Sequence, residues 1–208
     1  MTTSSGLLAG EAPRWSAMVS HPFVTATADG SLPQEAFDRW VVADHFFVVG
    51  FRRFLARLVE LAPDEAARDV LAGALPALGA ELDLFRRRAS DRGLDLDAEP
   101  GPVTLGYTSY LLALPADGWA AGVAGLFGAE KAYFDAWSAV RRAGSPTSPY
   151  RAFVDSWSSD AFGAWVDDVA TLLDRTVPPA DESATRAFGR VVRFELRFWD
   201  GVSSGDRW

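Results

Sequence analysis

The chain has 208 residues, a formal net charge of -8, and 49% hydrophobic residues. Its length suits one domain with a substantial core, so residues 1–208 are expected to form a single domain. The negative charge disfavours a nucleic-acid-binding protein, because no basic face is available to displace counterions from phosphates. The chain contains no cysteine, which excludes disulfides, thiolate metal sites and a thiol nucleophile.

The first residues, MTTSSGLLAGEAPRW, contain neither a basic segment nor a long apolar run, so no signal peptide is expected. No stretch approaches the roughly 20 apolar residues that a membrane span requires. We therefore expect a cytoplasmic protein without a membrane partner.

Almost every long segment shows helical periodicity, which predicts an all-α bundle of seven or eight helices. A weak pattern indicates a further N-terminal helix before His21. The first long helix is expected to run to about Leu61, with Ser31 and Gln34 at capping-box spacing at its start.

A second long helix is expected between Asp64, its N-terminal cap, and Gly93, its stop, with Pro76 as a potential kink. The segment PVTLGYTSYLLAL predicts a short helix closed by Pro115. A long helix follows over residues 118–144, two more are separated near Ser158 and Ser159, and a last one covers residues 181–202.

Several acids lie on stripes that helical periodicity directs into the core. Glu130 is preceded at helical spacing by Leu126 and Phe127 and followed by Tyr133 and Phe134. Three further acids have similar surroundings: Asp44, Glu195 and, less completely, Glu81. Asp135 lacks such neighbours and is expected to face solvent.

A buried carboxylate costs several kcal/mol unless it is paired or hydrogen-bonded. Any single one of these acids can have a structural role, bonded to a helix end or to an arginine such as Arg52 or Arg193. Several of them on separate helices of one bundle indicate a site, because converging carboxyl groups with separated pKa values supply acid–base chemistry.

A di-iron carboxylate site is the first chemistry that such a cluster suggests. It requires Glu-x-x-His motifs, but His21 and His45 are the chain's two histidines, and Glu130 is followed three residues later by Tyr133. A four-carboxylate metal site remains the less favoured alternative. We expect no metal and no cofactor, and favour metal-free hydrolysis of a small organic cation or heterocycle between aromatic walls.

Five segments resemble, in the same order, sequence blocks of the TenA (thiaminase II) family. They are HPFVTATADGSLPQEAFDRWVVADHFF, TLGYTSYLL, GAEKAYFDAW, YRAFVDSWSSDAFGAWVDDVATLLD and FELRFWD. The resemblance covers almost the whole chain. It implies the heme-oxygenase-like helical fold and a homodimer or homotetramer.

The resemblance also implies roles for individual residues. Asp44 matches the family's pyrimidine-binding aspartate, Tyr107 a tyrosine near the substrate ring, and Glu195 the acid that handles the leaving group. Phe47 and Trp157 stand at positions where the family has tyrosines.

Ala129 stands where the thiaminase branch has its nucleophilic cysteine. The branch without this cysteine carries an E-x-x-Y pattern like Glu130 to Tyr133. That branch hydrolyses aminopyrimidine breakdown products of thiamine to hydroxymethylpyrimidine in thiamine salvage, and this chain resembles it more closely. The implied reaction converts aminomethylpyrimidine and water to hydroxymethylpyrimidine and ammonia.

Glu130 and Glu195 are thus the predicted catalytic pair. The predicted substrate-binding residues are Asp44, Phe47, Glu81, Tyr107, Tyr133, Trp137 and Trp157. Glu130 is either the base that activates water or an anchor for the ring's amino group. Two other functions remain open: a non-catalytic heterocycle-binding protein, and an oxidase or oxygenase of the same fold.

Overall fold

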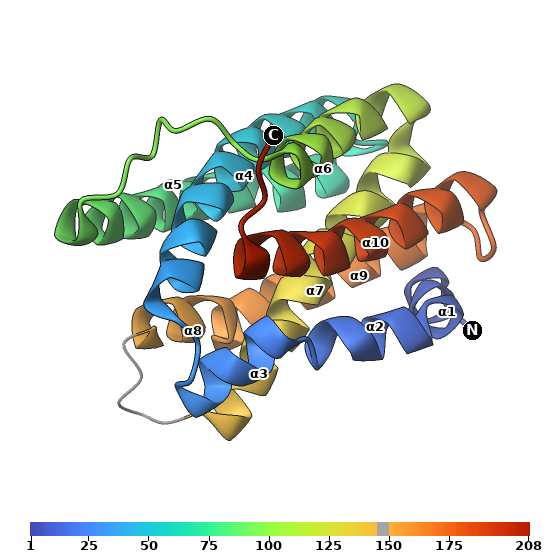
Figure 1. The fold of residues 1–208 in the computed structure, drawn as a ribbon. Helices are drawn as coiled ribbons and strands as arrows, with labels where there is room; N and C mark the ends of the chain where they lie inside the picture. The colour runs from blue at the N-terminus through green and yellow to red at the C-terminus, as the bar shows by residue number, and fades with distance from the viewer. Residues whose placement is uncertain (145–149) are drawn as a thin grey trace. The chain divides into compact units, whose positions relative to one another are not determined.

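The structure, a computed structural model, describes residues 1–144 and 150–208. These residues confirm the all-α prediction, because they form α-helices and one 3-10 turn and contain no strand. The helices (Figure 1) are α1 (Thr3–Gly10), α2 (Ala12–Val19), α3 (Pro22–Asp29), α4 (Gln34–Leu61), α5 (Glu65–Arg92), α6 (Pro102–Ala113), α7 (Trp119–Ala143), α8 (Arg151–Trp157), α9 (Asp160–Thr176) and α10 (Glu182–Ser204), with the turn η1 (Leu114–Asp117) after α6.

The described chain divides into two compact units. Unit 1 comprises Met1–Leu32 and Ala120–Trp199, and unit 2 comprises Pro33–Trp119 and Asp200–Trp208. That residues 1–208 form one folding domain stays a prediction. In the part of the chain that the structure describes, no helix combines the length and apolar character needed to cross a membrane.

Helix α7 is the central element of unit 1. All of its residues from Ala121 to Glu130 are buried. In Figure 1, α10 passes in front of α7. The two helices approach closely at Gly128, where an added Cβ would lie 2.9 Å from Cγ1 of Val191. A side chain at position 128 would therefore separate the two helices.

Unit 2 is built around α4, which packs against α5 and α6. The predicted limits of α5 are confirmed: the Asp64 side chain accepts a hydrogen bond from the Ala67 amide, and Gly93 ends the helix with a φ of 64°. Pro76 lies inside α5 without ending it. The left-handed conformation at Gly93 is one that glycine adopts without a steric penalty.

The predicted capping box at the start of α4 is wrong. Pro33 is the N-cap residue and makes no side-chain bond, while Gln34 donates instead to Asp38. Ser31 is used in the preceding turn, where its amide donates to the Asp29 carboxylate after the left-handed Gly30. The helix begins only after this turn is complete.

Two other boundaries bear on the sequence predictions. The region before His21 forms two short helices, α1 and α2, separated at Glu11, where the prediction had one further helix. The predicted break near Ser158 and Ser159 is confirmed, because the Ser159 hydroxyl accepts from the Phe162 amide and caps α9.

The start of α6 is capped from a distant part of unit 2. Gly101, its N-cap residue, has no side chain to offer, and Oδ2 of Asp206 accepts from the amides of Val103 (2.7 Å) and Thr104 (3.4 Å). An added Cβ at Gly101 would lie 2.4 Å from the Asp206 carboxylate. The carboxylate replaces the missing cap and complements the positive end of the helix dipole.

Replacing Asp206 should therefore destabilise the protein. We expect Asp206→Ala to lower the free energy of unfolding by about 1–2 kcal/mol, and Asp206→Asn, which keeps an acceptor, to lower it by less. Urea denaturation of both variants beside the wild type measures the difference. Equal stability of wild type and Asp206→Ala would contradict the capping role.

Candidate functional site

Unit 1 contains five of the nine predicted site residues, and all five are buried. They are Glu130, Tyr133, Trp137, Trp157 and Glu195. Their three helices, α7, α8 and α10, form the core of the candidate site.

The aromatic residues of this unit form a continuous cluster. Tyr133 meets Trp157 edge to face at 5.9 Å between ring centroids, and Trp137 stacks on Trp157 at 5.7 Å. Trp199 joins both of the α7 residues, stacking on Tyr133 at 5.7 Å and meeting Trp137 edge to face at 6.3 Å. The sequence prediction did not include Trp199 as a site residue, although its position four residues after Glu195 was a usable signal.

Glu195 is fully buried on the side of α10 that faces α7. It lies four residues after Val191 and four before Trp199, and both of these neighbours contact α7, at Gly128 and Tyr133. Residues four apart share a helix face. The burial predicted for Glu195 is confirmed.

Glu130 is the second buried acid, with 9% of its surface exposed. The indole Nε1 of Trp165, on α9, donates to its Oε1 at 2.8 Å. Burial raises the pKa of Glu130 from its ordinary 4.5 to about 7, although the hydrogen bond from Trp165 opposes this rise. A carboxyl group that titrates near neutrality can serve as an acid or a base at the pH of a cell.

The other four predicted residues lie in unit 2. Asp44 is fully buried on α4, and Phe47 and Tyr107 are in contact, with ring centroids 4.8 Å apart. Gly50 permits this contact: an added Cβ would lie within 2.2 Å of the Thr108 side chain, so α4 and α6 approach closely here.

Two predictions of side-chain environment need correction. Glu81 is half-buried rather than buried, because Ala77, one of the residues expected to cover it, is itself exposed. Asp135 does not simply face solvent: it is half-buried, and it accepts hydrogen bonds from Lys131 and from Nε1 of Trp15.

Metal ligands do not gather anywhere in residues 1–144 and 150–208, since no group of three or more His, Cys, Asp or Glu there could hold an ion. His21 is the N-cap of α3, where its Nδ1 accepts from the Phe23 amide at 3.1 Å. Burial, and to a smaller extent Arg86, lowers the pKa of His45.

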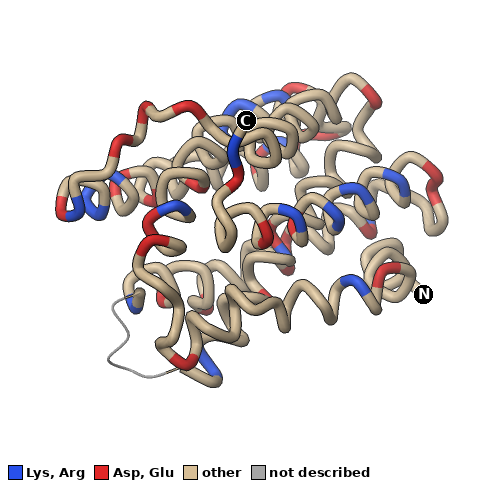
Figure 2. Tube along the Cα trace, in the orientation of Figure 1, with Lys and Arg blue, Asp and Glu red and all other residues tan. Residues whose placement is uncertain are grey.

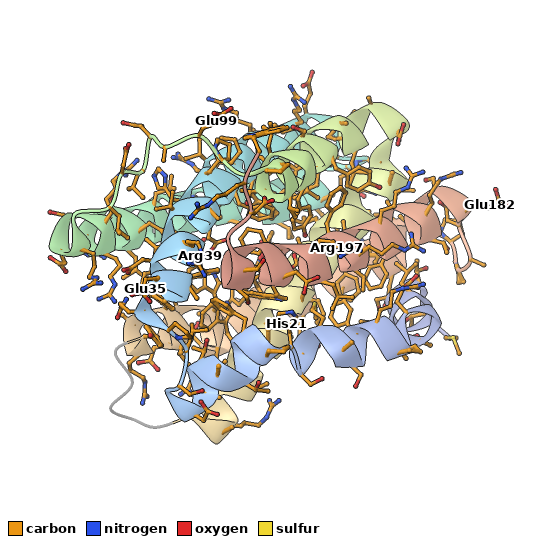
Figure 3. The ribbon with its side chains drawn as sticks, viewed as in Figure 1. His21, Glu35, Arg39, Glu99, Glu182 and Arg197 are labelled. Carbon is orange, nitrogen blue, oxygen red and sulfur yellow. The ribbon has the colours of Figure 1, made fainter. Side chains whose placement is uncertain are left out.

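A cavity of about 630 Å³ lies within unit 2, and none of the nine predicted residues lines it. Residues of the connection between α5 and α6 form part of its wall. Figure 2 shows in red the acidic residues of this connection, and Figure 3 labels three lining residues, Glu35, Arg39 and Glu99. Two of its acids stabilise the fold, because Asp38 pairs with Arg92 and Asp206 caps α6.

The raised pKa of Glu130 predicts a pH-dependent stability. The folded state holds this proton to a higher pH than the unfolded chain does, so the contribution of Glu130 to stability falls as the pH rises from 4.5 to about 7. Between pH 4.5 and 8, the wild type should lose up to about 3 kcal/mol more unfolding free energy than Glu130→Gln. Urea titrations across this range test it, and parallel pH curves would contradict it.

Comparisons with known proteins agree with this architecture. The TENA/THI-4/PQQC family model matches residues 11–205. The chain is 28% identical to an aminopyrimidine aminohydrolase from Halalkalibacterium halodurans, with 100% of this chain and 98% of that protein covered.

Solved structures give the same result. A TenA homologue from Pyrococcus furiosus has a TM-score of 0.92 at 30% identity, covering 96% of this chain and 99% of that one. A domain with a heme-oxygenase-like fold from Shewanella denitrificans has a TM-score of 0.75 at 14% identity, covering 98% of this chain and 97% of that one, which confirms the predicted fold. Since the family model spans nearly the whole chain, this protein belongs to the TENA/THI-4/PQQC family.

Proposed function

We propose that the protein is a metal-free hydrolase of aminopyrimidine breakdown products of thiamine, converting aminomethylpyrimidine to hydroxymethylpyrimidine in thiamine salvage. The similarity to an aminopyrimidine aminohydrolase over the full length of both chains supports the substrate class. Ala129 stands in place of the thiaminase cysteine and the chain contains no thiol, so water rather than sulfur is the nucleophile.

The observation that carries this proposal is the state of Glu130. Its carboxyl group is buried in the unit that holds the Tyr133, Trp137 and Trp157 rings, and its pKa is raised to about 7. A purely structural carboxylate would be expected to have charged or multiple hydrogen-bond partners that keep it ionised. Within the described part of the chain, Glu130 has one hydrogen-bond donor, Trp165.

The reaction needs one proton acceptor and one proton donor. Glu130, ionised, takes a proton from water as the water oxygen bonds to the methylene carbon attached to the pyrimidine. The bond from this carbon to the amino nitrogen breaks, and Glu195, protonated, gives its proton to the departing nitrogen, which leaves as ammonia. The proton gained by Glu130 balances the proton lost by Glu195.

Substrate binding is assigned to the remaining predicted residues. Asp44 holds the amino or ring nitrogens of the pyrimidine by charge-assisted hydrogen bonds. Phe47, Tyr107, Tyr133, Trp137 and Trp157 supply aromatic surface for the ring, and Glu81 an additional polar contact. Because Phe47 and Trp157 lack the hydroxyl groups of the family's tyrosines, they act by stacking and not by hydrogen bonding through a phenol.

Two further properties complete the proposal. The protein works in the cytoplasm, and it works as a homodimer or homotetramer, as the family resemblance implies.

The first experiment is an assay for ammonia release from aminomethylpyrimidine. Binding of the pyrimidine without ammonia release would instead support a non-catalytic heterocycle-binding protein.

The two glutamates should act as a unit. We expect Glu130→Gln and Glu195→Gln each to lower kcat by about 100-fold or more, and the double variant to be little worse than either. The wild-type pH profile should be bell-shaped, with its acid limb near pH 7 where Glu130 loses its proton.

A matched control is Asp135→Asn, which neutralises a half-buried acid elsewhere on α7 and should leave kcat nearly unchanged. Near-normal turnover by Glu130→Gln, with Glu195→Gln inactive, would make Glu130 a binding or structural residue. The base would then be sought at Asp44 or Glu81.

Asp44→Asn should weaken substrate binding by at least about tenfold while the fold survives, because it keeps the side-chain shape and removes the charge. Isothermal titration calorimetry with hydroxymethylpyrimidine measures the affinity, and circular dichroism checks the fold. Asp38→Asn, on the same helix and in a surface ion pair, is the control and should bind normally. Equal affinity of Asp44→Asn and wild type would remove Asp44 from the site.

A further inference from the structure

The indole groups of Trp165 and Trp15 each donate a hydrogen bond to an acid on helix α7, and the two acids differ in their surroundings. Trp165 donates to Glu130 at 2.8 Å, and Trp15 donates to Asp135 at 2.9 Å. The N–H group of an indole donates hydrogen bonds and accepts none. Asp135 also accepts from Lys131 and is half-buried, whereas Glu130 is buried and has Trp165 alone as a donor among the described residues.

The position of Trp165 follows from how α9 packs. The buried stripe of α9 consists of Val166, Val169, Leu172 and Leu173, and Trp165 lies beside it, half-buried. Two residues earlier, Gly163 lets α9 come close to α7, since an added Cβ would lie 3.0 Å from the Phe134 ring. This close approach at the N-terminal end of α9 brings the indole within reach of a carboxyl group on α7.

The hydrogen bond distinguishes the two oxygens of Glu130. Oε1 accepts from Trp165, whereas Oε2 has no hydrogen-bond partner in residues 1–144 and 150–208. A glutamate side chain has three rotatable bonds. The hydrogen bond from Trp165 to Oε1 restricts the direction in which the Glu130 carboxyl group points within the site. Oε2 is then the oxygen available to a substrate or to the water that attacks it.

We propose that Trp165 is a positioning residue for Glu130: its indole N–H holds Oε1 so that Oε2 is presented to the reacting water. The inference rests on the proposed function, because it assigns Trp165 through the role of Glu130 as the base. It adds a residue outside the nine predicted from the sequence, on a helix that supplies none of them.

The electrostatic surroundings make this bond important. Burial raises the pKa of Glu130 and the Trp165 bond lowers it, and no charged side chain contributes to the shift. On the three helices, Lys131 is ion-paired within α7, Asp168 on α9 is exposed, and Glu195 on α10 is buried. The indole is therefore the group that favours the ionised form of Glu130.

The test removes the N–H at position 165. In Trp165→Phe, the midpoint of the Glu130 carboxyl titration, followed by 13C NMR and assigned with Glu130→Gln, should rise by about one pH unit. At pH 6.5, kcat should fall about tenfold while KM stays within about twofold. The loss should become smaller at higher pH, where Glu130 ionises without help.

Trp15→Phe is the matched control, because it removes the same kind of bond from the same helix without touching Glu130. It should leave the Glu130 titration and kcat unchanged. An unchanged Glu130 titration in Trp165→Phe, or an equal fall of kcat in Trp15→Phe, would overturn the proposal.

A second variant keeps the shape of the ring. Benzothienylalanine at position 165 replaces the N–H with sulfur, so it should reproduce the raised titration midpoint even where Trp165→Phe folds poorly. A wild-type titration in this variant would overturn the proposal. If the wild type releases no ammonia, the proposed function fails, while the NMR titration still decides whether Trp165 controls Glu130.

Discussion

The burial of a carboxyl group in the middle of α7 is the constraint on which unit 1 depends. A charged group there is unstable unless the protein compensates for the lost hydration. Unit 1 compensates only in part, with one indole hydrogen bond, so the proton is retained to about pH 7. Incomplete compensation of this kind costs stability, and such a cost is typical of sites where an ionisable group has to change its charge during function.

Close helix packing produces this environment. Gly128 brings α10 against α7, and Gly163 brings α9 against it, so that the region around Glu130 is enclosed from two sides. Aromatic rings from α7, α8 and α10 fill the adjacent space. Small residues therefore lie where helices approach each other closely, and large aromatic rings lie where a flat ligand would need walls.

The sequence was sufficient for the long helices, because their apolar stripes repeat over many turns. Helical periodicity also predicted the burial of Asp44, Glu130 and Glu195, since burial on a helix follows from residues three and four positions away. The short helices α1 and α2 were harder to predict, because a segment of eight residues contains too few helical turns to show a clear hydrophobic period. The predicted capping box was wrong although its spacing fits, because the Ser31 amide already donates to Asp29 in the preceding turn.

Hydrogen-bond partners that are distant in the sequence could not be predicted from helical periodicity. Trp165 is 35 residues from Glu130, and Asp206 is 103 residues from the amide that it caps. Nothing in the local pattern around either residue indicates its partner, since these contacts depend on how helices are placed in three dimensions. The catalytic and binding roles stay predictions.

The stacked indoles of unit 1 have an optical consequence. Trp137 and Trp157 lie nearly parallel, with an interplanar angle of 28°, and Trp199 meets Trp137 at 74°. Indoles packed against one another in an asymmetric environment give near-ultraviolet circular dichroism that disappears when specific packing is lost. The cluster is thus a built-in spectroscopic reporter for unit 1, and a flat aromatic ligand inserted among these rings would change that spectrum without any added label.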